Sequence, residues 1–306
     1  MKRQSVFLQN NQKFRRMLIP AWLIAMAILA AACGGSSLPA PTESSPQPTN
    51  TPAATAPDLP PVEIPLSQYL RFGHLTTEDG LSNDAIWGLA QDSHGIIWIG
   101  TYAGLNRYDG SSFKVYRHDP NDPFSLSDDV LRGVIVDQSG VLWVGTWNAG
   151  LNQFDRATER FIRYRHDPEN PYSLSHDLVR TIYEDRSGSI WVGTMGGLNK
   201  LDPATKQFTR YLHDPDDPDS LPDNIVWSVY EDRAGMLWVG TENGLGQFDP
   251  QTETFVHYQR HDPLDPHSLS HNSVRSIIED GNGVLWLGTM GGLDRLNRET
   301  GQVTRY

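Results

Sequence analysis

Four histidines in this chain recur in one setting that could suggest metal binding. Each stands in a His-Asp-Pro phrase, at His118, His166, His213 and His261. Imidazole is a common metal ligand. However, the copies lie about 48 residues apart, each beside prolines, and Asp-Pro and Ser-rich stretches are typical of turns. We therefore predict connections between structural elements at these positions, and no metal site.

Three acidic pairs are the next candidates for chemistry. They are Glu184-Asp185, Glu231-Asp232 and Glu279-Asp280. Two neighbouring carboxyl groups can serve as general acid and base. Each pair stands directly before a short Gly-containing turn, where an Asp side chain bonds readily to the local backbone. We predict a turn-forming role for the pairs, no catalytic residue and no cofactor.

These residues belong to a unit that the chain repeats five times. The copies begin near Leu81, Leu126, Leu174, Leu221 and Leu269, at periods of 45 to 48 residues. Each copy contains a Trp-x-Gly-Thr phrase, which starts at Trp98, Trp143, Trp191, Trp238 or Trp286. A period of this length, divided into four short strands, is typical of a β-propeller blade.

The third copy shows the expected strands most clearly, at residues 178–185, 189–194, 198–202 and 207–213. Short turns separate them. We therefore predict an all-β fold for residues 67–306. It is a β-propeller of four-stranded antiparallel blades, with about five blades present.

The repeated Trp and Gly residues have architectural roles in this fold. We expect Trp191 to fill the space between neighbouring sheets and Gly193 to admit a close neighbour. Gly188 and Gly197 stand at the hairpin turns, where positive φ angles are common.

Aligning the copies singles out two columns of bulky or charged residues. The column inside the first strand reads Trp87, Arg132, Arg180, Trp227 and Arg275. The column after Gly-Thr reads Tyr102, Trp147, Met195, Glu242 and Met290. First strands line the channel of a propeller, and aromatic faces with forked guanidinium donors suit sugar rings and carboxylates. The first column, with Tyr102 and Trp147, is therefore our predicted ligand site. The alternative is that these residues only pack or pair between blades.

The N-terminal part predicts export and tethering. Residues 1–32 have a basic start followed by an uncharged run and predict a signal peptide. The run ends in Leu-Ala-Ala-Ala-Cys, which resembles a bacterial lipoprotein signal and implies lipidation of Cys33; an uncleaved membrane anchor is the alternative. Residues 33–66, rich in Pro, Ser and Thr, predict a disordered linker. We expect an extracytoplasmic, membrane-anchored protein, either periplasmic or a cell-surface lipoprotein.

Charge excludes one class of partner. The formal net charge is −12, and it is −17 for residues 33–306 once the five N-terminal basic residues are set aside. Nucleic-acid binding needs clustered Lys and Arg, so we expect no nucleic-acid partner. Cys33 is the one cysteine, which rules out an internal disulfide.

Several phrases resemble the two-component regulator propeller repeat. Examples are EDRSGSIWVGTMGGLNKLDP (184–203) and RHDPENPYSLSHD (165–177), and the resemblance extends over about residues 67–306. It implies the extracytoplasmic sensor of membrane histidine kinases, often hybrid ones, whose known ligands in gut bacteria are mostly oligosaccharides. It also implies many more repeats, which form two seven-bladed rings before a β-sandwich, a membrane span and a kinase core.

The expected function is ligand sensing or ligand binding without chemistry, because the chain contains no Gly-rich nucleotide loop and no phospho-acceptor His motif. The expected partners are a glycan or other small molecule, the membrane, and possible further blades or a kinase. Two alternatives stay open. One is a lyase or hydrolase that resembles the streptogramin-inactivating lyases, for which His257 would be the unusual residue. The other is a platform for protein interactions.

The strand count predicts an incomplete array. YLRFGH (69–74) matches the fourth strand FIRYRH (161–166), and the last repeat already has its own fourth strand, at 302–306. A closed five-blade ring would therefore have one fourth strand too many. An open array exposes a blade face, so we expect this chain to be poorly soluble or to associate.

Overall fold

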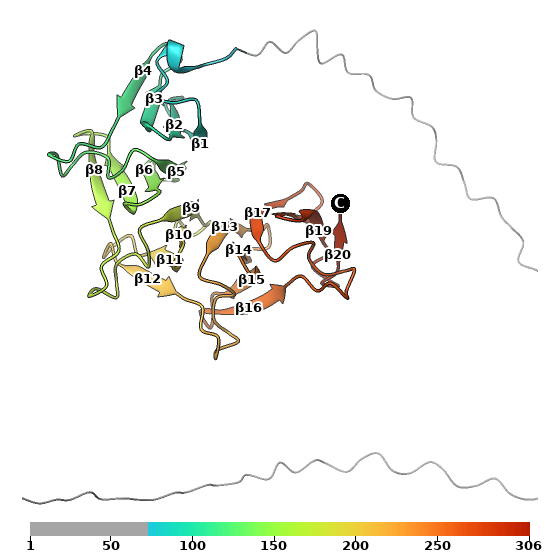
Figure 1. Cartoon of the computed structure of the whole chain (residues 1–306). Helices are drawn as coiled ribbons and strands as arrows, with labels where there is room; N and C mark the ends of the chain where they lie inside the picture. The colour runs from blue at the N-terminus through green and yellow to red at the C-terminus, as the bar shows by residue number, and fades with distance from the viewer. Residues whose placement is uncertain (1–72) are drawn as a thin grey trace, which may run out of the picture. The chain divides into compact units, whose positions relative to one another are not determined.

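Each repeat folds into one antiparallel sheet whose four strands pair in chain order. In the computed structural model, which describes residues 73–306, five such sheets follow one another along an arc (Figure 1). A short 3-10 turn, η2 (Thr77–Asp79), precedes the first sheet. The predicted all-β fold of four-stranded blades is confirmed. The predicted signal peptide, the linker and Cys33 lie outside the described residues.

Each blade takes its strands from one repeat. Blade 1 holds β1 (Ile86–Gln91), β2 (Ile97–Thr101), β3 (Gly104–Tyr108) and β4 (Phe113–Tyr116). Blade 2 holds β5 (Leu131–Val136), β6 (Leu142–Thr146), β7 (Leu151–Asp155) and β8 (Arg160–Tyr164). Blade 3 holds β9 (Val179–Glu184), β10 (Ile190–Thr194), β11 (Gly197–Leu201) and β12 (Phe208–Tyr211). Blade 4 holds β13 (Val226–Glu231), β14 (Leu237–Thr241), β15 (Gly244–Asp249) and β16 (Thr254–Gln259). Blade 5 holds β17 (Val274–Glu279), β18 (Leu285–Thr289), β19 (Gly292–Leu296) and β20 (Val303–Arg305).

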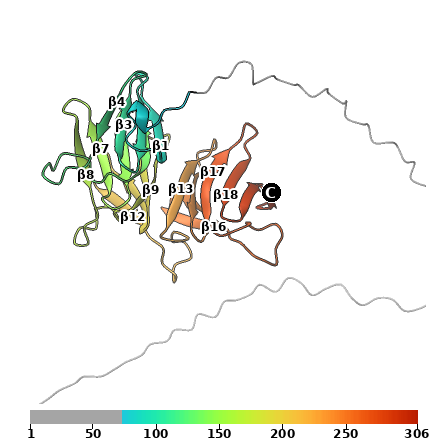
Figure 2. The same cartoon turned by 45° about the horizontal axis from the view of Figure 1, so that its top comes forward.

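The first strands lie on the inner side of the arc, and the fourth strands lie on its outer side (Figure 1). Along the inner side β1 packs beside β5, β5 beside β9, β9 beside β13, and β13 beside β17. Figure 2 shows the same succession of blades from a second direction. Residues that share a position in the first strands of neighbouring blades are therefore close in space, although they are far apart in the sequence.

The tryptophan of each Trp-x-Gly-Thr phrase joins one blade to the next. Trp98 of blade 1 is 1% exposed and packs with Val134 and Leu142 of blade 2. Trp143, Trp191 and Trp238 repeat this contact and are also buried, whereas Trp286 of blade 5 is only half-buried. The prediction that Trp191 fills the space between two sheets is confirmed, because it packs with Val226 and Val229 of blade 4.

The glycine of the same phrase permits close contact between blades. A Cβ atom added to Gly193 would stand 2.6 Å from Thr181 Cγ2 and 2.7 Å from Val226 Cγ1. Real Cβ atoms do not approach other atoms so closely, so this position requires glycine. The predicted roles of the turn glycines are also confirmed, because Gly188 and Gly197 have φ angles of 83° and 128°.

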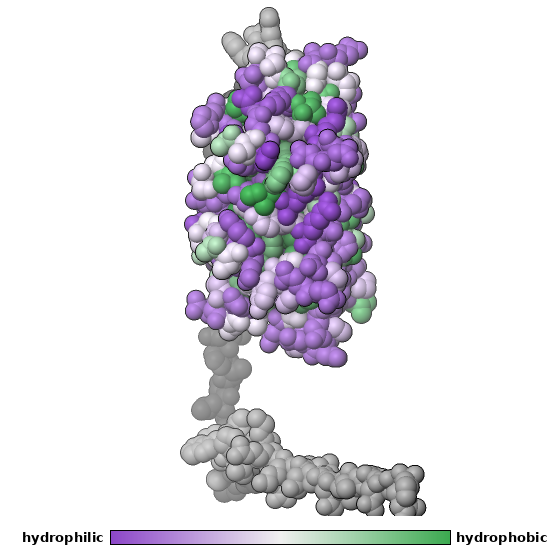
Figure 3. Space-filling model, turned by 90° about the vertical axis from the view of Figure 1, so that its left-hand side faces the viewer, coloured by the Kyte–Doolittle hydropathy of each residue, from purple (hydrophilic) through white to green (hydrophobic). Residues whose placement is uncertain are grey.

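The outer faces of the first and last described blades expose residues that are buried within the array. Ile86 and Leu89 in β1 are 49% and 66% exposed, whereas the residues at the same positions in β5, Leu131 and Val134, are 0% and 5% exposed. In blade 5, Ile278 is 61% exposed. By contrast, the side that carries β8 is mostly hydrophilic, with isolated hydrophobic residues (Figure 3). Apolar first-strand residues are therefore exposed at both ends of the described array.

Candidate ligand-binding site

Arginine and tryptophan side chains alternate across the inner side of the array. The guanidinium carbon of Arg132 lies 3.9 Å from the ring centroid of Trp87 and 3.9 Å from that of Trp147. Arg132 is thus held between two indole faces, one from blade 1 and one from its own blade. Attraction of a cation to the electron-rich face of an indole favours this arrangement.

The alternation continues through blades 3, 4 and 5. The guanidinium carbon of Arg180 lies 4.9 Å from the Trp147 ring and 4.2 Å from the Trp227 ring. Arg275 stacks on Trp227 at 3.4 Å. At the other end, the Tyr102 and Trp87 rings are 5.6 Å apart. We call this series the Arg–Trp ladder; in spatial order it consists of Tyr102, Trp87, Arg132, Trp147, Arg180, Trp227 and Arg275.

All seven predicted ligand-binding residues belong to this ladder. The sequence placed them in two columns, and the structure brings both columns together, because the residue after the second strand stands beside the start of the first strand. Two other members of the second column behave differently. The Met195 Sδ atom lies 3.2 Å from Arg180 Nη2, whereas Met290 is 62% exposed at the end of the described array.

Glu242 places a negative charge beside the ladder. Its carboxylate accepts hydrogen bonds from Trp227 Nε1 at 2.6 Å and from Ser273 Oγ at 2.9 Å. It also lies 3.6 Å from Arg275 Nη2. Our sequence analysis did not choose Glu242 as a site residue. The sequence did contain a signal for this residue, because Glu242 is the one acidic residue in the column after Gly-Thr.

In the described part of the chain, the positive charges of the other two ladder arginines have no neighbouring carboxylate of this kind. Within residues 73–306, Arg275 is the one ladder arginine with a carboxylate at ion-pair distance. The buried Nε atoms of Arg132 and Arg180 have no hydrogen-bond partner in this part of the chain. Burial lowers the pKa of both guanidiniums, and the charges of Arg132 and Arg275 lower that of Arg180 further. The ladder therefore concentrates positive charge within an acidic protein.

The geometry determines which atoms a ligand could reach. The Arg132 and Arg180 guanidiniums each lie over two indole rings, and their N–H groups point to acceptors in the guanidinium plane. The cavities described in residues 73–306 are lined by residues outside the ladder. Every ladder residue is at least partly exposed, so the ladder forms an open strip on the inner side of the array.

The residues considered for chemistry have structural partners. The ring Nδ1 atoms of His118, His166, His213 and His261 lie 2.7 to 2.8 Å from backbone carbonyls in the connections between blades. In the acidic pairs the Asp forms the turn, as predicted: Asp185 Oδ1 accepts hydrogen bonds from the backbone of Ser187 and Ser189. The Glu instead reaches the preceding blade, where Glu184 accepts from the backbone of Gln138 at 2.8 Å.

Repeated four-stranded blades joined by interblade tryptophans define this chain as a β-propeller repeat protein. Four segments match the family model described as two component regulator propeller, at residues 80–103, 173–196, 220–243 and 268–291. The chain therefore contains two-component regulator propeller repeats, which confirms the resemblance inferred from its phrases.

Similar proteins include an extracellular domain of a two component system, a histidine kinase and a lyase. The extracellular domain of a protein described as a hybrid two component system from B. thetaiotaomicron is 31% identical, with a TM-score of 0.66; the match covers 76% of this chain and 31% of that domain. Histidine kinase P4 of Formosa agariphila is 44% identical over 55 residues, which are 18% of this chain and 4% of the kinase. Virginiamycin B lyase from Staphylococcus aureus is 14% identical, with a TM-score of 0.52, and the match covers 72% and 69% of the two chains.

These comparisons differ in what they support. The chain spans less than a third of the length of this extracellular domain and a small part of the histidine kinase. The similarity to the lyase shows a shared fold only. Within residues 73–306 no helix is long and apolar enough to cross a membrane.

Proposed function

We propose that this chain is an extracytoplasmic, ligand-sensing part of a two-component signal transduction system. The matched repeats and the 31% identity to the extracellular domain from B. thetaiotaomicron support this proposal. In it, the propeller binds a small ligand, of oligosaccharide type or a similar class, and a kinase partner responds. The chain itself carries out no reaction.

The Arg–Trp ladder is the observation that carries the ligand-binding part of the proposal. Three arginines lie along the ladder, and within residues 73–306 Arg132 and Arg180 have no carboxylate at ion-pair distance. The indole ring of Trp147 lies between these two guanidiniums. Such a strip suits a ligand that combines apolar ring faces with carboxylate groups, because forked donors bind carboxylates well and the exposed parts of Trp87 and Tyr102 can pack against apolar ring faces. An acidic oligosaccharide has both features.

No observation favours the enzyme alternative over sensing. The similarity to the lyase is one of fold. The residue that raised this alternative, His257, has a structural partner, because its Nε2 lies 2.8 Å from the backbone oxygen of Ser220. Arg210 and Arg305 make the equivalent contact in blades 3 and 5, where Nε donates to the backbone oxygens of Ser173 and Ser268. His257 thus stabilises a connection between blades by a hydrogen bond to its backbone.

Calorimetry with a matched pair of sugars tests the ligand site. A glycan panel would first rank ligands, and trigalacturonate and neutral maltotriose would then be titrated into the purified chain. We expect the acidic sugar to bind more tightly. We expect Arg180→Ala to weaken its binding by about tenfold or more, since a charge-assisted hydrogen bond is worth roughly 1.5–3 kcal/mol.

Arg165→Ala is the matched control, because Arg165 is exposed in a connection outside the ladder. It should bind like the wild type, and circular dichroism should show an unchanged fold in both variants. Equal binding of any acidic or neutral panel ligand by wild type and Arg180→Ala would place recognition elsewhere. In that case the ladder would be a device for joining blades.

A further inference from the structure

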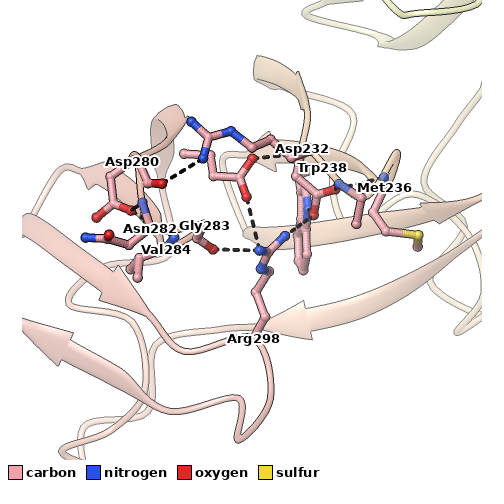
Figure 4. A network of polar contacts seen from close by, with 12 residues as sticks. Asp232, Met236, Trp238, Asp280, Asn282, Gly283, Val284 and Arg298 are labelled. Atoms are coloured by element: carbon pink, nitrogen blue, oxygen red, sulfur yellow. Dashed lines mark hydrogen bonds and ion pairs between the residues drawn. The ribbon is translucent and has the colours of Figure 1, made fainter.

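An arginine side chain lies between blades 4 and 5, beside the turn that follows the first strand of each blade. We call this position, which recurs between each pair of neighbouring blades, the interblade slot. This slot lies at the opposite end of the first strands from the ladder. Arg298, from the hairpin between β19 and β20, donates to Asp232 Oδ2 at 2.5 Å and to Glu279 Oε1 at 3.1 Å. It also donates to the carbonyl of Gly283 at 2.6 Å (Figure 4). The slot thus offers three acceptors, and one guanidinium satisfies all of them.

The slot between blades 1 and 2 is filled in the same manner. Arg156, from the hairpin between β7 and β8, donates to Asp92 Oδ2 at 2.8 Å and to the carbonyl of Gly140 at 3.3 Å. Val136 stands where Glu279 stands in blade 5, so this slot has one acceptor fewer. In both filled slots the aspartate is buried, with Asp92 at 6% and Asp232 at 1% exposure.

The slot between blades 2 and 3 has the full set of acceptors and lacks the arginine. Asp137, Glu184 and Gly188 occupy the positions of Asp232, Glu279 and Gly283. Pro203 stands where the other two slots have arginine. Asp137 keeps the local geometry of its counterpart, because its Oδ2 accepts from Trp143 Nε1 at 2.8 Å and Oδ1 accepts from the backbone of Val141.

A cavity of about 320 Å³ lies in this slot. Its lining includes all four of these positions, Asp137, Glu184, Gly188 and Pro203, and the ring of Trp143. This volume is at the lower end of the range for small-molecule sites, roughly 300 to 1,000 Å³. Burial raises the pKa of Glu184, and the nearby charges of Asp137 and Asp185 add to the effect. A cation that enters the cavity would offset the free-energy cost of burying the ionised Glu184 carboxylate.

The two basic residues in the cavity lining leave the acceptors open. Arg186 is directed toward blade 4, where its Nη1 and Nη2 donate to the carbonyls of Arg233 and Asp232. Lys206 is exposed. In residues 73–306 neither one forms an ion pair with Asp137 or Glu184.

The slot between blades 3 and 4 provides a contrast. It also carries a proline, Pro250, but Arg186 Nε lies 3.9 Å from its glutamate, Glu231. The residue at the position of Arg186 in blade 2 is the neutral Gln138. The slot between blades 2 and 3 therefore lacks both cations that serve its counterparts.

We propose that the slot between blades 2 and 3 is a binding site for a guanidinium group, carried by a small molecule or by an arginine side chain of a peptide. The slot between blades 4 and 5 holds a guanidinium on all three of these acceptor positions, and the slot between blades 1 and 2 holds one on two of them. A planar group with forked donors can bond to Asp137, Glu184 and the Gly188 carbonyl together, which a compact ammonium ion cannot do equally well. The site is separate from the Arg–Trp ladder.

Nuclear magnetic resonance on the full chain tests this site, because the indole proton of Trp143 reports on Asp137. Ethylguanidinium is the probe, propylammonium is the comparison ion, and Trp143→Phe assigns the signal. We expect a saturable shift of the Trp143 signal with ethylguanidinium, at an affinity higher than that for propylammonium. A capped arginine that binds tenfold more tightly than ethylguanidinium would identify a peptide as the source of the group; equal or weaker binding would favour a small molecule.

Pro203→Arg supplies the decisive variant. The loops Asp155-Arg156-Ala157-Thr158 and Asp202-Pro203-Ala204-Thr205 differ only at this position, so the new arginine should fold as Arg156 does. It should fill the slot and weaken ethylguanidinium binding at least tenfold, whereas Pro203→Ala should bind like the wild type. The proposal is overturned if the wild-type Trp143 signal shows no saturable shift up to the solubility of the probe, or if Pro203→Arg binds like Pro203→Ala.

Discussion

Asp92 shows how one side chain can hold a turn, a core tryptophan and a neighbouring blade together. Its Oδ1 accepts from the backbone of His94 and Ile96, and its Oδ2 accepts from Trp98 Nε1 at 3.0 Å and from Arg156 Nη1 at 2.8 Å. Burial alone would raise the pKa of this carboxyl group, but the hydrogen bonds from Trp98, Arg156 and the backbone outweigh burial and lower the pKa to about 2.

The lowered pKa of Asp92 makes part of the stability depend on pH. The carboxylate stabilises the folded state by about 2 kcal/mol above pH 4, since each pKa unit is worth about 1.4 kcal/mol. As the pH falls through the unfolded-state pKa of 3.8 toward about 2, this contribution is lost. We expect Asp92→Asn to lower the free energy of unfolding at pH 7 and to have roughly half that effect at pH 3.

Chemical denaturation at the two pH values measures the difference between wild type and Asp92→Asn. Asp216→Asn is the control, because Asp216 is exposed in a connection between blades. It should show no such dependence on pH. An Asp92→Asn effect of equal size at pH 7 and pH 3 would show that the ionised carboxylate is not what stabilises this position.

At the scale of the strand and the blade, the sequence predicted most of what the structure shows. The predicted strands of the third repeat agree with β9 to β12 within two residues at each end, because period, turn glycines and apolar runs all indicate the same boundaries. The repeat also allowed the candidate site to be found, since the two columns that vary in residue type stand out against a constant frame.

Contacts between blades were harder to predict. Each repeat predicts its own sheet, but the stagger of one sheet on the next decides which columns meet. Trp147 comes from the second column, yet it lies between Arg132 and Arg180 of the first. The acceptors of the interblade slots are likewise divided between two repeats, so that Asp137 and Glu184 meet only in the folded array. A pattern within one repeat cannot reveal such a pair.

The Gly-Thr phrase provides a test of packing between blades. We expect Gly193→Ala to destabilise the protein by roughly 1–3 kcal/mol, because its Cβ would overlap Thr181 and Val226 in a well-packed region. Gly281→Ala is the matched control: a Cβ there would meet nothing within 4 Å. Thermal and chemical unfolding of both variants measures the effect. Equal stability of the two variants would mean that the blades can separate to accept a methyl group.

At the scale of the whole array, the contact between blades is directional. One blade presents its tryptophan and glycine, and the next presents the aliphatic residues of its first strand. This contact occurs four times within residues 73–306, between successive blades. The two halves of the same contact are exposed at the two ends, with Leu89 at 66% exposure in blade 1 and Trp286 half-buried in blade 5. The two exposed faces are therefore complementary to each other.

Complementary faces at opposite ends predict association of the purified 306-residue chain. One copy can place Ile86 and Leu89 on the Trp286 face of another, and such head-to-tail contacts form open chains unless the rotation closes a ring. We expect sedimentation velocity to show species larger than a monomer that increase with concentration. Leu89→Lys should shift the distribution toward monomer without lowering the thermal midpoint, because Leu89 contributes little buried area.

Leu264→Lys, at a position that is 90% exposed in a connection, should associate like the wild type. A wild-type chain that stays monomeric at all concentrations, or one that responds equally to both substitutions, would show that the end faces do not bind each other.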